Sequence, residues 1–293
     1  MTIALFGNTS YPEHFNKYIQ HLIKKLENEH VNLIIEKDFY LFLKKTVRFK
    51  KSPELFNSHE ELNENVNFLL SIGGDGTLLK AVTYIRDTEI PILGINTGRL
   101  GFISSISATQ IDEAINDILK KNYTINERIL LELNTSKKLF SDKNFALNEV
   151  AVLKKDTSSM IKIDAFVDNE FLNTYWADGL VISTPTGSTG YSLSCGGPII
   201  MPGTNNIIIT PNAPHNLNVR PIVISDDSIV RLKIEDRDQL ALVSLDSRSR
   251  AFESSIELTI KKSPFKIKLV QPENNSFTST IRNKLMWGLD KRS

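Results

Sequence analysis

The stretch Ser71-Ile72-Gly73-Gly74-Asp75-Gly76-Thr77-Leu78-Leu79 decides the fold of this chain. An apolar run enters a turn of glycines that carries one carboxylate, and the residues after it predict a helix. Glycines let backbone N–H groups approach an anion closely, and a helix N-terminus adds a favourable dipole. The order strand, glycine turn, helix therefore predicts a phosphate-handling site, with Asp75 placed among the donors.

The same turn also has a purely conformational explanation, because Gly and Asp dominate tight turns. It matches neither the Gly-x-x-x-x-Gly-Lys-Ser/Thr loop nor the Gly-x-Gly-x-x-Gly dinucleotide motif. If the turn does bind phosphate, its chemistry differs from that of those two common classes.

Length and composition narrow the class of protein. A chain of 293 residues exceeds what one hydrophobic core usually serves, so we expect two domains. The net charge of +1 gives no electrostatic argument for a nucleic-acid partner. A single cysteine, Cys195, excludes a disulfide within the chain, and no signal peptide or membrane span is evident. We expect a cytoplasmic protein acting on small molecules, without nucleic-acid or membrane partners.

Strand and helix patterns alternate in the first part of the chain. Apolar spacing predicts helices over residues 11–29 and 111–119, and another from the glycine turn to Tyr84. Short apolar runs predict strands at 3–6, 31–35, 68–72 and 91–95. This alternation predicts an α/β domain with a parallel sheet.

After about residue 126 the pattern becomes mostly β. Short β-branched runs predict strands at 129–133, 146–153, 161–167, 179–183, 207–210, 229–234 and 255–261. A closing helix is expected over 276–288. We therefore predict an α/β domain over 1–125, a β-rich domain over 126–273, and a C-terminal helix over 274–293 that returns to the first domain.

A second informative block lies in the β half, from Ala177 to Pro198. It is rich in hydroxyl groups, which together with backbone amides suit a polar ligand, and Tyr191 adds an aromatic wall with a polar tip. The alternative is a helix N-terminus capped by Ser188 or Thr189. Capping and ligand binding are compatible.

Several ordered blocks together resemble the NAD kinases. They are Gly73-Gly74-Asp75-Gly76-Thr77, Asn96-Thr97-Gly98-Arg99-Leu100-Gly101-Phe102, Asn148-Glu149, residues 178–198, Thr210-Pro211 to His215-Asn216-Leu217, and Leu285-Met286-Trp287-Gly288. The Gly-Gly-Asp-Gly turn is shared with diacylglycerol, sphingosine and phosphofructokinase-like kinases, so the other blocks carry the specificity. The resemblance implies the NAD kinase and diacylglycerol kinase-like fold, and a homotetramer or homodimer.

The implied reaction transfers the γ-phosphoryl group of ATP to the 2′-hydroxyl of the adenosine ribose of NAD. By its place in the motif, Asp75 takes the hydroxyl proton as general base. Backbone amides of Gly73, Gly74, Gly76 and Thr77, with Mg²⁺ or another divalent cation, suit the charged phosphoryl group. Arg99 is a candidate phosphate clamp, with an exposed loop arginine as the equal alternative.

The resemblance also assigns the NAD site. Asn148 and Glu149 look like the pair that grips adenine and ribose, with a polar strand end as the alternative. His215 is a weaker candidate near the nicotinamide or the phosphates. The other positions implied to contact the dinucleotide are Asp178, Ser188, Thr189, Gly190, Tyr191, Ser192, Ser194 and Arg248.

Three positions depart from the family pattern. Gly190 replaces the usual Ala, and Trp176 stands where some relatives carry Arg. Asp246-Ser247-Arg248 replaces Asp-Gly-Gln or Asp-Ser-Gln, which leaves the contact by Arg248 open. Two other functions remain in view: a lipid kinase, and a dinucleotide sensor without catalysis. The sequence leaves open polyphosphate as donor, NADH as acceptor, and feedback by NADPH.

Overall fold

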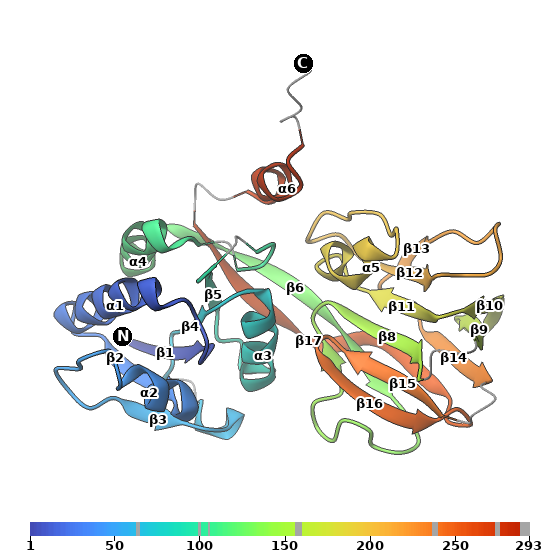
Figure 1. The fold of residues 1–293 in the computed structure, drawn as a ribbon, viewed down its shortest axis with the longest axis horizontal. Coiled ribbons are helices and arrows are strands. Elements are labelled where there is room, and N and C mark those ends of the chain that lie inside the picture. The colour runs from blue at the N-terminus through green and yellow to red at the C-terminus, as the bar shows by residue number, and fades with distance from the viewer. Residues whose placement is uncertain are drawn as a thin grey trace. The chain divides into compact units, whose positions relative to one another are not determined.

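The computed structural model describes residues 1–62, 65–98, 101–104, 106–155, 160–235, 240–272 and 276–287. The chain divides into two compact units (Figure 1). Unit 1 comprises Met1–Glu127 and Ile267–Ser293, and unit 2 comprises Arg128–Lys266. Strands β6 (Tyr123–Asn134) and β17 (Leu258–Pro272) run from one unit into the other. Unit 1 is therefore assembled from two separate parts of the chain.

Unit 1 contains a parallel sheet flanked by helices. Its neighbouring strands follow the order β17, β5, β4, β1, β2, β3, and each of these pairs is parallel. Its elements are β1 (Thr2–Gly7), η1 (Glu13–Phe15), α1 (Asn16–Asn28), β2 (Asn32–Glu36), α2 (Lys37–Leu43), β3 (Glu54–Phe56), η2 (His59–Glu61), β4 (Phe68–Ile72), α3 (Asp75–Ile85), β5 (Ile92–Ile95), η3 (Ala108–Gln110), α4 (Ile111–Lys120) and α6 (Phe277–Leu285).

The two faces of this sheet are covered by different helices. Alternate strand residues such as Ile3, Leu5 and Leu70 share one core cluster with the apolar faces of α1, α2 and α4. On the opposite face, Tyr84 of α3 packs against Phe6, with ring centroids 5.1 Å apart. A parallel sheet covered on both faces places its strand ends, and the turn that opens α3, at one edge.

Unit 2 is built from antiparallel strands. One sheet has the order β13, β12, β11, β8, β15, β16, and β10, β9, β14 and β17 are neighbours in the other. Its elements are β7 (Phe145–Ala146), β8 (Glu149–Lys154), β9 (Ile161–Val167), β10 (Glu170–Ala177), β11 (Gly179–Ser183), η4 (Gly187–Thr189), α5 (Tyr191–Ser194), β12 (Asn206–Asn212), β13 (Ile222–Ser225), β14 (Val230–Glu235), β15 (Leu240–Leu245) and β16 (Arg248–Glu253).

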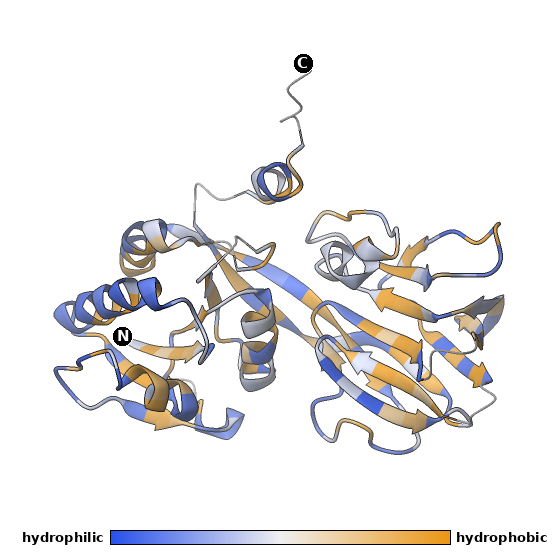
Figure 2. Ribbon diagram, viewed as in Figure 1, coloured by the Kyte–Doolittle hydropathy of each residue, from blue (hydrophilic) through white to orange (hydrophobic). Residues whose placement is uncertain are grey.

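Inward-facing residues of both sheets form a single core in unit 2. In β9, for example, Ile161, Ile163 and Ala165 are fully buried, whereas the residues between them are not. Figure 2 shows the apolar strands of both units and the polar visible face of α1. An α/β unit with a parallel sheet and a β-rich unit confirm the predicted fold class.

The structure corrects several element predictions. The helix expected over 11–29 is α1 preceded by a 3₁₀ turn, and the closing helix ends at Leu285 rather than 288. Helix α2 was not predicted, because it follows β2 without a breaker and is capped by an unusual residue: Glu36 accepts from Phe39 N at 2.8 Å. Strands β3, β10, β13, β15 and β16 were also missed.

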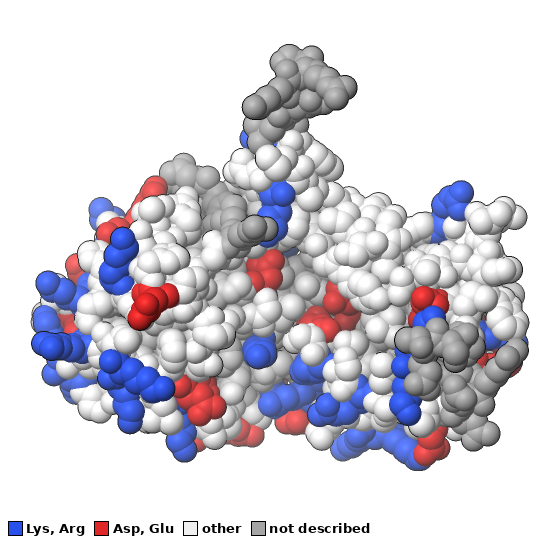
Figure 3. Space-filling model, viewed as in Figure 1, with Lys and Arg blue, Asp and Glu red and all other residues white. Residues whose placement is uncertain are grey.

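The basic region 44–51 lies on the surface of unit 1, where Lys44, Lys45 and Lys51 are exposed. Figure 3 shows basic side chains on the visible face of unit 1 interspersed with acidic ones. Within the described part of the chain, no helix is long and apolar enough to cross a membrane.

Candidate active site

Asp75 is the first residue of α3, and its carboxylate is held by a neighbouring loop of unit 1. Oδ2 accepts from the backbone amide of Phe102 at 2.8 Å, and Oδ1 accepts from Ile103 at 3.2 Å and Ser104 at 2.8 Å. The donors therefore come from the segment after β5 rather than from the glycine turn itself. Three bonds leave one lone pair on Oδ2 for another donor.

The loop around Asp75 is fixed by several contacts with the strand ends. Gly101 N donates to Ser104 O at 3.2 Å, which closes a tight turn. The Ser104 side chain is fully buried, and its hydroxyl donates to Gly73 O at 3.1 Å. A Cβ atom at Gly94 would lie 2.7 Å from the Cα of Ser104. Glycine is needed at 94 because the loop packs directly on β5.

The glycine turn presents backbone amides at the start of α3. Gly73 N donates to Ile95 O and Thr77 N to Gly74 O, each at 2.9 Å, so these two amides are engaged. For the amides of Gly74, Asp75 and Gly76, no acceptor occurs among the described residues. These are the free donors expected at a helix N-terminus, where the dipole favours an anion.

Asn148 and Glu149 lie together at the start of β8 in unit 2. Their exposed fractions are 9% and 7%, yet neither Asn148 Oδ1 nor Glu149 Oε2 has a hydrogen-bond partner among the residues that the structure describes. Burial and, to a smaller extent, the charge of Asp246 raise the pKa of Glu149 to about 8, against the opposing effect of a backbone hydrogen bond from Tyr191. Buried polar atoms without partners are costly, so a ligand that pairs with them gains affinity.

The hydroxyl-rich block divides into inward and outward side chains. Ser188 donates to Pro185 O at 2.6 Å and accepts from Ile200 N, and Ser192 pairs with the buried Thr210 hydroxyl at 2.8 Å. Thr189 Oγ1 donates to Thr186 O at 3.1 Å, whereas Ser194 is exposed. The capping alternative is wrong, because α5 begins after Gly190 without any side-chain cap.

Gly190 and Tyr191 lie close to the other predicted site residues Asn148 and Glu149. A Cβ atom at Gly190 would lie 2.9 Å from Glu149 Oε2 and 3.3 Å from Asn148 Nδ2. Burial raises the pKa of Tyr191, with smaller contributions from Cys195, Asp178 and Glu149. The Tyr191 hydroxyl accepts from Asn212 Nδ2 at 2.9 Å.

Two further predicted residues, Asp178 and His215, have contacts within the protein. Asp178 forms an ion pair with Lys154 at 2.7 Å. His215 is exposed, and its backbone amide donates to Trp176 O at 2.8 Å. Arg99 lies outside the described residues.

The guanidinium of Arg248 is engaged by the protein itself. It donates to the backbone carbonyls of Lys143 and Phe145, and it lies over the Phe145 ring at 5.6 Å. These contacts anchor the segment that precedes Asn148.

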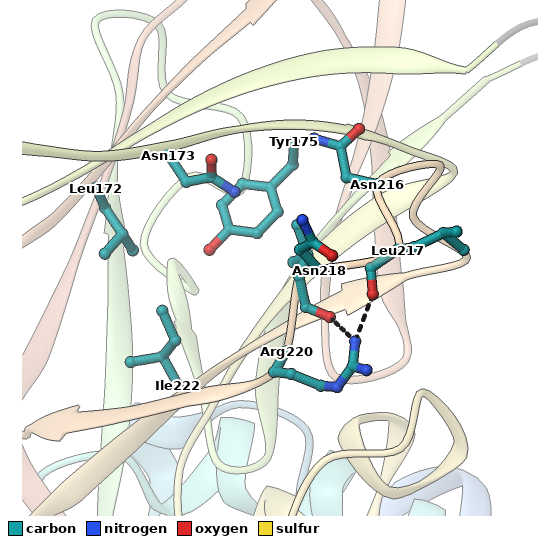
Figure 4. Close-up of a pocket in the computed structure, with 9 residues that line it drawn as sticks. Leu172, Asn173, Tyr175, Asn216, Leu217, Asn218, Arg220 and Ile222 are labelled. Carbon is teal, nitrogen blue, oxygen red and sulfur yellow. Dashed lines mark hydrogen bonds between the residues drawn. The ribbon is translucent and has the colours of Figure 1, made fainter.

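A surface pocket of about 760 Å³ in unit 2 contains none of the predicted site residues (Figure 4). It is lined by Leu172, Asn173, Tyr175, Asn216, Leu217, Asn218, Val219, Arg220 and Ile222. Its one cationic side chain, Arg220, donates to the carbonyls of Leu217 and Val219 at 2.7 and 2.8 Å. The guanidinium of Arg220 is therefore engaged by the loop to which it belongs.

Sequence reasoning missed the residues that support the site. Gly101, Phe102 and Asp246 lay inside quoted motif blocks without a role, and Ser104 and Lys154 gave no signal. Arg128 was also missed: its Nη1 donates to Thr186 Oγ1 at 3.4 Å, and its buried Nε has no hydrogen-bond partner in the described part of the chain. Burial lowers the pKa of Arg128 to about 10.

Comparison with known proteins covers both units. The family model of the ATP-NAD kinase N-terminal domain matches residues 11–123, and that of the ATP-NAD kinase C-terminal domain matches residues 147–272. Proteins named NAD kinase from Flavobacterium psychrophilum, Cytophaga hutchinsonii and Bacteroides fragilis are 46%, 45% and 44% identical. Each alignment covers 100% of both chains.

Two solved structures share the fold. The yeast NADH kinase complexed with NADH has a TM-score of 0.86 at 24% identity, covering 98% of this chain and 88% of that one. An NAD kinase from Archaeoglobus fulgidus in complex with ATP has a TM-score of 0.74 at 28% identity, covering 98% of this chain and 99% of that one.

Proposed function

The chain belongs to the ATP-NAD kinase family, and on that premise we propose that it phosphorylates the 2′-hydroxyl of the adenosine ribose of NAD, converting ATP and NAD to ADP and NADP. The observation that supports this function most directly is the position of Asp75 at the start of α3, where three backbone amides of the loop after β5 hold its carboxylate. The lipid kinase and the sensor lose support, because the full-length relatives described above are named NAD kinase.

In the proposed reaction, Asp75 acts as general base. The attacking hydroxyl is a weak nucleophile at neutral pH, and a positioned base contributes about 10²- to 10⁴-fold to such a step. Oδ2 keeps the unused lone pair, so it is the oxygen we assign to the 2′-hydroxyl proton. The amide bonds on both oxygens hold the carboxylate in one orientation.

Unit 1 supplies the phosphate-handling part of the proposed site. The free amides of Gly74, Asp75 and Gly76 and the dipole of α3 suit phosphate oxygens, and Arg99 is kept as a candidate clamp. A divalent cation such as Mg²⁺ neutralises charge on the ATP phosphates. The described residues contain no group of three His, Cys, Asp or Glu side chains that could hold a metal. Mg²⁺ commonly binds through phosphate oxygens of its substrate and keeps several water ligands, so a cation that enters with ATP suits this proposal.

Unit 2 supplies the proposed NAD contacts. The unpaired oxygens of Asn148 and Glu149 can accept from the adenine amino group and ribose hydroxyls. Gly190 and Tyr191 lie beside this pair, and the charge of Asp178 acts on the Tyr191 hydroxyl. Ser188 and Ser192 shape this region from inside, because their hydroxyls already have protein partners.

We propose further that the protein is a cytoplasmic homodimer or homotetramer, as the family resemblance implies. Exposed apolar side chains in unit 2 support self-association: Leu217 is 87% exposed and Phe171 55% exposed. Light scattering during gel filtration tests the assembly, and a Leu217→Asp variant that stays the same size would exclude this residue from the contact.

A coupled assay tests the reaction. Purified protein is incubated with ATP, Mg²⁺ and NAD, and NADP is measured with an NADP-specific dehydrogenase. Replacing ATP with polyphosphate, or NAD with NADH, defines donor and acceptor. NAD binding in calorimetry without NADP formation would indicate a sensor, and phosphorylation of diacylglycerol in micelles without NADP would indicate a lipid kinase.

A further inference from the structure

The Asp246 carboxylate accepts hydrogen bonds from three consecutive backbone amides of the segment that carries Asn148 and Glu149. It lies in the turn between β15 and β16. Leu147 N donates to its Oδ2 at 3.0 Å, and Asn148 N and Glu149 N donate to its Oδ1 at 2.8 and 3.3 Å. The amides of Leu147 and Asn148 find no other acceptor in the described part of the chain.

Further contacts make this turn rigid. Asp246 N donates back to Glu149 O at 3.0 Å, and Ser244 Oγ donates to Asp246 O at 2.9 Å. On the other side, Thr184 donates its hydroxyl to Leu147 O at 2.6 Å and its amide to Asn148 O at 2.9 Å. The backbone of 147–149 is therefore held through both its N–H and its C=O groups.

We propose that Asp246 is a positioning residue for NAD binding, whose carboxylate fixes the backbone of 147–149 so that the unpaired oxygens of Asn148 and Glu149 face the dinucleotide. The inference rests on the proposed function of that pair. A carboxylate suits this task, because it accepts several N–H bonds at once without offering a competing donor. An amide in its place presents an NH₂ group that cannot accept from the Leu147 amide.

The charge of Asp246 also affects the pKa of Glu149. The titratable groups near the Glu149 carboxyl are Asp246, Tyr191 and Cys195. The pKa of Glu149 is raised first by burial and then by the charge of Asp246. Burial also raises the pKa of Asp246, against the opposing effect of its backbone hydrogen bonds and of the positive charge of Arg248. Removing the Asp246 charge therefore lowers the pKa of Glu149, which a purely structural role would not require.

The test is Asp246→Asn in the full-length protein. Asp246 has a φ of 52°, a left-handed conformation that Asn and Gly adopt readily, so Asp246→Asn and Asp246→Gly are both compatible with the backbone. We expect KM for NAD to rise about tenfold or more, with kcat and KM for ATP changed less than about threefold, as when ground-state binding is lost. The pH at which KM for NAD changes should move downward in Asp246→Asn.

Asp226→Asn is the matched control. Asp226 is a buried aspartate of unit 2, 2% exposed, that pairs with Lys262 at 3.1 Å and does not contact 147–149. Both variants can lower thermal stability, but only Asp246→Asn should raise KM for NAD and speed hydrogen exchange at 147–149. An unchanged KM and pH profile in Asp246→Asn and Asp246→Gly, while Asn148→Ala raises KM for NAD, would overturn the positioning role alone. An unchanged KM in Asn148→Ala would instead reject the proposed NAD pair.

Discussion

Gly101 packs against the Asp75 carboxylate so closely that a Cβ atom at position 101 would overlap Oδ1 of Asp75. The residues that directly follow Gly101 donate the amides that hold the Asp75 carboxylate. Neither the loop nor the carboxylate can therefore move aside easily. Gly101→Ala should displace Asp75 and lower kcat by about 100-fold or more, as expected when a general base is misplaced. Steady-state kinetics measures this, with NAD affinity followed by calorimetry.

Gly98→Ala is the matched control in the same loop. Of the atoms in the described residues, a Cβ atom there would come within 4 Å only of Asn96 Oδ1, at 4.0 Å. We expect near-wild-type kcat for this variant. Equal losses in the two variants would show that the loop tolerates no side chain for reasons unrelated to Asp75.

Asp75→Asn removes the proton acceptor while keeping the shape of the side chain. We expect kcat to fall by about 10²- to 10⁴-fold, with the fold and most of the NAD affinity retained. The NADP assay and calorimetry together measure both effects. Near-wild-type turnover would remove Asp75 from the chemistry.

Asn148→Ala separates the two substrates. Because its buried Oδ1 has no hydrogen-bond partner within the described segments, we assign that partner to NAD. KM for NAD should rise about tenfold, in the range expected for losing a buried hydrogen-bond partner, and more than KM for ATP. Equal changes in the two KM values would argue against an NAD-specific role.

Glu149→Gln should stabilise the protein at high pH. Burial raises the pKa of Glu149 from 4.5 to about 8 in the folded protein. Between these values the folded state binds a proton that the unfolded chain has lost, so stability falls as pH rises, by up to about 1.4 kcal/mol per pH unit, and the loss is complete above about pH 8.

Thermal melts at pH 6 and pH 9 measure this difference. The gain in Tm from Glu149→Gln should be larger at pH 9, whereas Glu170→Gln, at an exposed strand end, serves as control. A gain of the same size at both pH values would contradict a titrating carboxyl at position 149.

Local patterns predicted most of the fold. The apolar run before Gly73 and the helical spacing of α1 and α4 depend on neighbours in sequence, and the structure confirms them. Strand β16 was missed because most of its residues, Arg248–Glu253, are charged or polar, whereas β15, Leu240–Leu245, is an apolar run that fits the strand pattern and was overlooked. The glycine motif identified Asp75, but its three amide donors are 27 to 29 residues away, and such a contact leaves no local pattern.

The same limit explains the errors in the hydroxyl block. Its composition indicated ligand contacts throughout, but side-chain direction depends on packing with distant strands. Thr210 of β12, for example, turns the Ser192 hydroxyl inward. Composition could predict the presence of polar groups here, and only the fold determines which of them face outward.

Strand β17 has a consequence for the order of folding during synthesis. It pairs with β5 at Leu269 and Ile92, so the sheet that begins the chain lacks its last neighbour until residue 269 has left the ribosome. Until then β5 has an open edge, and such edges invite pairing with other chains. A fragment ending at residue 127 should therefore aggregate, and the first unit to be translated is the last to be completed.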